Sequence, residues 1–244
     1  MRGNEEGFPI AGENKIYKLG SAMVDDLMYA ITNINVIFYI VAYLFGGIPF
    51  GYVFAKLFYR IDITQVGSGS VGATNVYRAL KEVDEKNAKK FSILTIILDA
   101  SKGFIVVLLA KIFGLDYSVQ YMIALLAVLG HCYSPYLNFH GGKGVATAIG
   151  SVILLIPVES ILGLVVWGLV GKVLKISSLS SLLGVLSGIA LTFIVPYVLP
   201  LPQGINITAQ IHSHVPVVLI GVLILYTHYP NLKRLFRGEE KKVL

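Results

Sequence analysis

The sequence contains few charged residues. They make up 14% of its 244 positions, whereas 55% of the positions are hydrophobic. Soluble domains carry about 25% charged residues, so this composition excludes an ordinary soluble domain and predicts an integral membrane protein. The single cysteine, Cys132, excludes an internal disulfide, and we interpret it as a small structural side chain. The first residues lack the short basic and apolar pattern of a cleaved signal peptide.

Several chemical motifs are also missing. The carboxylates of Asp62 and Asp99 are isolated in sequence, so we expect neither a metal nor another cofactor. A Walker A loop is excluded because Leu137 stands where its first glycine would be. None of the histidines is followed five positions later by aspartate, the pair that acyl-CoA and acyl-carrier acyltransferases use. The net charge of +6 is typical of cytoplasmic loops facing anionic lipid, so we expect no nucleic-acid partner.

Apolar runs long enough for membrane helices recur along the chain. They predict an all-α integral membrane protein with seven transmembrane helices, at residues 34–58, 91–113, 117–137, 145–156, 161–174, 182–199 and 215–226. We expect Gly46, Gly47 and Pro49 to bend the first helix, either to pack it closely or to open a groove. The stretch 81–90 is charged and typical of a segment outside the membrane, and 175–181 is expected to be a polar loop. The predicted regions are a polar N-terminal extension (1–32), a membrane domain (33–240) and a basic tail (241–244).

Basic residues indicate the orientation of this predicted bundle. Lysines and arginines gather in the loops around Gly67, Gly141 and Ser177 and in the tail, whereas the opposite inter-helix loops hold only Lys111. The positive-inside rule then places the N-terminus outside and the C-terminus in the cytoplasm. The glycine-rich loops would all lie on the cytoplasmic face, where one active site could be assembled from them.

Two glycine-rich loops carry the clearest chemical signal. Residues 67–78 read GSGSVGATNVYR, and residues 140–144 read HGGKG. Closely spaced glycines let backbone N–H groups converge on an anion, and Arg78, Lys143 and Arg234 supply cations. His228, Asn231 and Arg234 recur one helical turn apart and share a helix face. Asp99 and Lys102 also share a face, which predicts an ion pair or a functional role at membrane depth.

Together these motifs resemble those of the bacterial acyl-phosphate:glycerol-3-phosphate acyltransferases. The likeness runs from about Gly46 to Glu240 and depends on three motifs in order: Asp62, Gly67 to Asn75 and Arg78; His131, Pro135, Phe139 and Gly141 to Thr147; His228, Asn231, Arg234, Gly238 and Glu240. The resemblance implies transfer of a fatty acyl group from acyl phosphate to the sn-1 hydroxyl of glycerol-3-phosphate, without a metal. The product would be lysophosphatidate, made in the first step of phospholipid synthesis.

The resemblance also implies site residues and a location. Catalytic roles would fall to Ser68, His228 and Asn231. The expected substrate-binding residues are Gly67, Gly69, Asn75, Arg78, Gly141, Gly142, Lys143, Ser178 and Ser181. We expect the protein to be surrounded by membrane lipid in the bacterial cytoplasmic (inner) membrane. Its site would lie on the cytoplasmic face, and the protein would be a monomer.

Two questions stay open at this point. His228 could orient the substrate or accept its proton, and the substrate phosphate could accept that proton instead. A transporter for a phosphate-bearing solute is the non-enzymatic alternative, favoured only by the charged residues Asp99 and Lys102.

Overall fold

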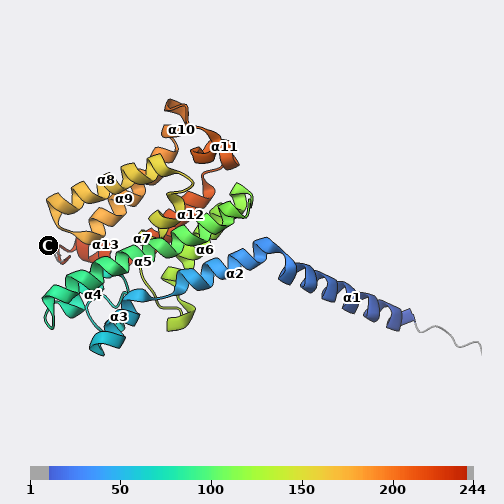
Figure 1. Cartoon of the computed structure of the whole chain (residues 1–244), viewed down its shortest axis with the longest axis horizontal. Helices are drawn as coiled ribbons and strands as arrows, with labels where there is room; N and C mark the ends of the chain where they lie inside the picture. Colours follow the sequence, from blue (N-terminus) through green and yellow to red (C-terminus); the bar gives the residue numbers. More distant parts are fainter. Residues whose placement is uncertain (1–10, 241–244) are drawn as a thin grey trace, which may run out of the picture. The chain divides into compact units, whose positions relative to one another are not determined.

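The computed structural model describes residues 11–240 (Figure 1). Within this range the chain forms α-helices joined by short 3₁₀ turns, and one isolated bridge pairs Ser134 with His140. The all-helical fold class is therefore confirmed. The first ten residues of the predicted extension and the predicted tail 241–244 lie outside the described residues.

The chain divides between Ile37 and Phe38 into two compact units. The first unit contains α1 (Ala11–Thr32) and the beginning of α2 (Ile34–Gly47). The second unit contains the rest of α2 and the helices α3 (Phe50–Tyr59), α4 (Ala73–Leu80), α5 (Glu85–Ile112), α6 (Tyr117–Cys132), α7 (Val145–Val152), α8 (Pro157–Leu174), α9 (Ser177–Thr192), α10 (Val195–Val198), α11 (Ile207–Ile211), α12 (Val215–Thr227) and α13 (Tyr229–Phe236). In this unit α8 lies beside α9, and α5 beside α7 (Figure 1).

Four helical segments among the described residues are long and apolar enough to cross a membrane: Ile34–Tyr59, Glu85–Ile112, Pro157–Leu174 and Ser177–Val198. α12 and α13, which meet at a 57° bend, would make a fifth. α6 is a shorter apolar helix. α7 has 8 residues, a length of about 12 Å, against a hydrocarbon core roughly 30 Å thick. Each predicted apolar range contains a helix, whereas seven crossings and the orientation stay predictions.

The predicted loop 175–181 is helical from Ser177 onward, and much of the charged stretch 81–90 is helical as well. Residues 85–90 form the start of α5, because the side chain of Asp84 caps the helix by accepting a hydrogen bond from the Asn87 amide. The serine-rich stretch from Ser177 onward is the first turn of α9. Ser180 illustrates why serine is tolerated there, since its hydroxyl donates to the Ile176 carbonyl one turn earlier (2.8 Å).

Glycines allow the helices of the second unit to approach closely. α2 ends at Gly47 and α3 begins after Pro49, which confirms the predicted break. A side chain at Gly46 would collide with the backbone of Ala127 in α6, and one at Gly150 would collide with the backbone of Ala100 in α5. The first of these contacts supports the helix-packing interpretation of the bend.

The core of this unit is formed mainly by α5, α6, α7 and α12. Its fully buried side chains include Val107, Ile123 and Ile224. This apolar packing fixes the ends of the helices, and the polar loops that join them meet at one cavity.

Candidate active site

The loop before α4 is held in shape by Asn75. Its amide nitrogen donates to the carbonyls of Ile63 (2.9 Å) and Val66 (3.0 Å), and its Oδ1 accepts the backbone N–H of Ser68 (3.0 Å). Gly67 turns the chain here with a φ of 60°, and a side chain there would strike the Asn75 amide oxygen. Asn75 therefore fixes the position of Ser68.

The second glycine-rich loop, between α6 and α7, is tied to the first. The Val71 amide donates to the Gly141 carbonyl (3.4 Å), and the Gly142 amide donates to the His131 carbonyl (2.9 Å). Gly142 lies so close to the His131 ring that a side chain could not fit between them. These contacts hold Lys143, the next residue, at a fixed place beside the first loop.

A single carboxylate joins the start of α9 to α13. Glu240 accepts hydrogen bonds from Ser178 Oγ (2.9 Å), Asn231 Nδ2 (2.8 Å) and Arg234 Nε (2.7 Å). Its side chain is only 4% exposed. Burial by itself would raise the pKa of Glu240, but the hydrogen bonds from Asn231, Arg234 and Ser178 hold that pKa below its ordinary value. Glu240 is therefore a buried anion that orients two polar side chains of the predicted site.

These loops enclose a cavity of about 350 Å³. One part of its wall is polar and is formed by Ser68, Ser70, Thr74, Asn75, Arg78, Asp99, His131, Lys143, Ser177, Ser178, Ser181, His228, Asn231 and Glu240. Another part is apolar and includes Ile96, Ile149, Leu164, Trp167 and Val185. A molecule with both a charged head and an apolar tail matches this division.

Arg78 and Lys143 supply cations to the polar wall, and the charge of Lys143 is sensitive to its surroundings. Burial lowers the pKa of Lys143 to about 8, against the effect of the Glu240 carboxylate, which raises it. The guanidinium groups of Arg234 and Arg78 add to the lowering. Lys143 is thus poised to lose its charge just above neutral pH unless an anion binds beside it.

His228 lies in the bend between α12 and α13, and its side chain is buried in the cavity wall. Its Nδ1 is 2.8 Å from the Ile224 carbonyl oxygen. Because a carbonyl can only accept a hydrogen bond, Nδ1 carries the proton, and the neutral ring keeps Nε2 as an acceptor. This is the tautomer that could accept a hydrogen bond from a substrate hydroxyl.

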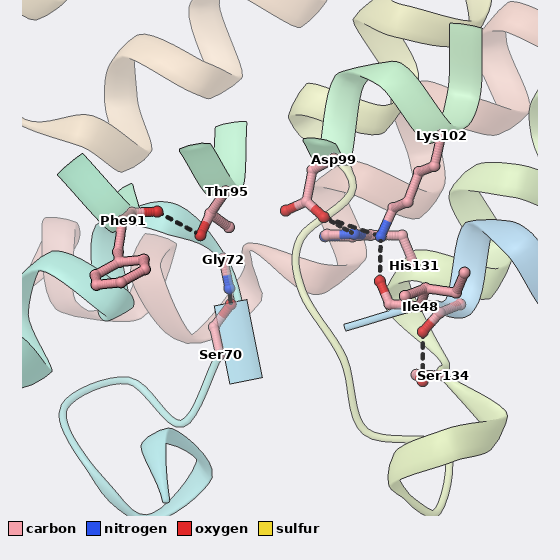
Figure 2. A network of polar contacts seen from close by, with 10 residues as sticks. Ile48, Ser70, Gly72, Phe91, Thr95, Asp99, Lys102, His131 and Ser134 are labelled. Carbon is pink, nitrogen blue, oxygen red and sulfur yellow. Dashed lines mark hydrogen bonds and ion pairs between the residues drawn. The ribbon is translucent and has the colours of Figure 1, made fainter. Parts of the chain in front are cut away.

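A buried ion network includes Asp99 and His131 of the cavity wall and continues behind it to Lys102 (Figure 2). Lys102 Nζ is 3.0 Å from Asp99 Oδ1 and donates to the Ile48 carbonyl at 2.9 Å, while His131 Nδ1 is 3.6 Å from the same Asp99 oxygen. The predicted pairing of Asp99 with Lys102 is confirmed. Ser134 adds a hydrogen bond to the Gly47 carbonyl (2.6 Å), so this region joins α5, α6 and the break after α2.

Most of the predicted site residues lie in the cavity wall: Ser68, Asn75, Arg78, Lys143, Ser178, Ser181, His228 and Asn231. The other predicted residues, Gly67, Gly69, Gly141 and Gly142, shape the two loops behind that wall. Glu240 belongs to the third motif, yet it was not among the predicted site residues. The signal that could have revealed it was its short spacing from Asn231 and Arg234, whose side-chain N–H groups need a hydrogen-bond acceptor.

The fold and the cavity define a multi-pass membrane protein that presents fixed cations beside an apolar wall. A family model described as glycerol-3-phosphate acyltransferase matches residues 36–238. The chain belongs to this family, and it is therefore an acyltransferase of phospholipid synthesis.

Individual relatives agree with the family assignment. The chain is 66% identical to the glycerol-3-phosphate acyltransferase of Helicobacter hepaticus over 223 residues, which cover 91% of this chain and 100% of the relative. It is 54% identical to that of Helicobacter pylori over 221 residues, with the same two coverages. It also resembles the crystal structure of PlsY (YgiH), an integral membrane glycerol 3-phosphate acyltransferase, in its glycerol 3-phosphate form. That comparison gives a TM-score of 0.73 and 38% identity, and covers 85% of this chain and 94% of the other.

Proposed function

We propose that this protein transfers a fatty acyl group from acyl phosphate to the sn-1 hydroxyl of glycerol-3-phosphate. The hydroxyl oxygen attacks the acyl carbonyl carbon, the bond from that carbon to the phosphate oxygen breaks, and inorganic phosphate leaves. The hydroxyl proton is released in the same step, and lysophosphatidate is the other product. The observation that carries this proposal is the single cavity whose wall combines Arg78, Lys143 and serine hydroxyls with an apolar surface.

The polar wall supports binding of two phosphate groups. Arg78 can hold one phosphate through two parallel hydrogen bonds, and Lys143 offers a compact charge for another. Ser178 and Ser181, at the start of α9, add hydroxyl donors. Solved relatives support both ends of the reaction, because PlsY is described in a glycerol 3-phosphate form and in a lysophosphatidic acid form.

The rate enhancement would come mainly from positioning. Acyl phosphate is already activated, and holding two reactants in line lowers a barrier by about 7–11 kcal/mol. Ser68 and Asn231 would hydrogen bond the reacting groups, and His228 Nε2 would orient the attacking hydroxyl. The leaving phosphate is itself basic enough to accept the proton. The acyl chain would lie against Leu164, Trp167 and the other apolar wall residues.

The arrangement in the membrane is part of this proposal. The chain would cross the bacterial cytoplasmic membrane seven times as a monomer, with its N-terminus outside. The basic residues of the loops support a cytoplasmic position for the cavity, where soluble glycerol-3-phosphate is available.

The test uses the purified full-length protein in detergent or lipid. Labelled glycerol-3-phosphate is offered with acyl phosphate, with acyl-CoA or with no donor, and lysophosphatidate is measured. We expect product with acyl phosphate alone, and a loss of at least about 100-fold in Arg78→Ala, since one charge-assisted contact stabilises by about 1.5–3 kcal/mol and an unpaired phosphate adds to the cost. Arg237→Ala is the matched control, because Arg237 is exposed and lies outside the cavity wall.

The outcomes separate the parts of the proposal. Product formed with acyl-CoA instead would contradict acyl phosphate as the acyl donor, while the acyltransferase activity of the family would still stand. Equal loss in Arg78→Ala and Arg237→Ala would overturn the assignment of the cavity.

A further inference from the structure

α1 carries an apolar face that the family match does not include, because the match begins at residue 36. The side chains of this apolar face are between 51% and 74% exposed: Leu19, Met23, Val24, Leu27, Met28 and Ile31. At 100° per residue they cover an arc of about 180°. The opposite half of the helix holds Lys18, Ser21, Asp25, Asp26, Tyr29 and Thr32. Residues 18–32 of α1 are thus divided lengthwise into an apolar half and a polar half.

The chain connection limits where α1 can be. It ends at Thr32, and the segment of membrane-crossing length begins at Ile34. Two residues span at most about 7 Å. The C-terminal end of α1 therefore lies at the surface of the bilayer, whatever the direction in which the helix continues.

α1 could continue from this point into the hydrocarbon, into water or along the membrane surface, and the first two courses conflict with its side chains. A course into the hydrocarbon would bury the charges of Lys18, Asp25 and Asp26, which is costly away from a partner. A course into water would leave six large apolar side chains exposed along one face, far more than isolated surface residues. A course along the membrane surface places the apolar half in lipid and the polar half in water.

The width of the apolar face also distinguishes lipid from a second protein helix. A helix pair buries a narrow seam with apolar residues 3 and 4 apart, whereas the arc of α1 covers about half of the helix circumference. The charges on the polar half, Lys18 against Asp25 and Asp26, give no net attraction to an anionic surface. Burial of apolar side chains is then what holds the helix.

We propose that α1 is an interfacial helix that lies along the surface of the bilayer, with its apolar face among the acyl chains of zwitterionic lipid. It extends the membrane contact of the enzyme by about 22 Å, the length of the segment from Lys18 to Thr32 that carries the apolar face. It also fixes the depth of the first crossing helix at the point where that helix enters the membrane.

Site-directed labelling tests this placement in the full-length enzyme. Cys132 is replaced by alanine, which leaves no other cysteine in the sequence. Single cysteines are then introduced by Met23→Cys and Leu27→Cys on the apolar face, and by Ser21→Cys and Asp25→Cys as matched controls on the polar half. Each variant is labelled with a fluorophore and reconstituted into phosphatidylcholine vesicles, and its acyltransferase activity is checked.

We expect nitroxide-labelled lipid to quench the labels at positions 23 and 27 at least threefold more than those at 21 and 25. Aqueous iodide should quench in the opposite order. Adding phosphatidylglycerol should change neither pattern. Equal iodide quenching at all four positions would overturn the proposal, as would protection at 23 and 27 that disappears when the protein is diluted in lipid, because that result indicates a second protein copy.

Discussion

With Lys143 assigned to the phosphate of glycerol-3-phosphate, the charge of this side chain should control how tightly that substrate binds as pH changes. The pKa of this side chain is about 8 in the ligand-free protein. The substrate phosphate has its second pKa near 6, so it stays a dianion from pH 7 to pH 9. A dianion beside the ammonium group raises the Lys143 pKa in the complex, so binding takes up a proton above pH 8. Affinity is therefore retained below pH 8 and falls as pH rises beyond it.

The size of this effect follows from the fraction of Lys143 that is charged. With a pKa of about 8, that fraction is about 0.9 at pH 7 and about 0.1 at pH 9. If the charged form alone binds well, KM for glycerol-3-phosphate rises about tenfold between these two values, a change of about 1.4 kcal/mol in binding free energy. The turnover rate at saturating substrate should change much less.

The assay is a set of initial rates at saturating acyl phosphate, at half-unit steps from pH 7 to pH 9. Lys143→Arg is the informative variant, because arginine stays charged over the whole range. Its KM can be higher throughout, since arginine differs in shape, but it should be independent of pH. A wild-type KM that stays constant, or an arginine variant with the same tenfold rise, would refute this reasoning.

Three further substitutions test the supporting contacts. Glu240→Gln removes the charge that faces Arg234, so we expect the free energy of unfolding to fall by about 1.5–3 kcal/mol and the thermal midpoint to fall with it. Glu239→Gln, at the exposed neighbouring position, should keep the wild-type midpoint. Asn75→Ala removes three hydrogen bonds of the first glycine-rich loop, so activity should fall well below wild type while circular dichroism stays helical; wild-type kinetics would contradict that role. Neither oxygen of the buried Glu159 carboxylate accepts a hydrogen bond within residues 11–240. Glu159→Met should therefore raise the free energy of unfolding by about 1–3 kcal/mol and raise the thermal midpoint. A lower midpoint would show that the carboxylate has a partner.

Local sequence was sufficient wherever a short-range rule applies. Apolar runs predicted where apolar helices lie along the chain, and the Gly46 to Pro49 stretch predicted the break between α2 and α3, because both depend on residues adjacent in the chain. The spacing of Asp99 and Lys102 predicted their pairing for the same reason. Helix ends were not predicted as well: the cap at Asp84 starts α5 within a stretch whose charge indicated only that it lies outside the membrane.

The sequence by itself determined the class of protein and, through its three motifs, the reaction family, because these properties depend on composition and on residue types at fixed spacing. Only the tertiary structure decided which motif residues line the cavity and which shape the loops behind it. The role of Glu240 depends on α9 and α13 meeting, since its carboxylate accepts from Ser178, 62 residues away in the chain. The pKa of Lys143 likewise depends on burial and on charges brought from two other segments, α4 and the C-terminal stretch from Arg234 to Glu240. Packing sets these distances, and spacing along the chain does not.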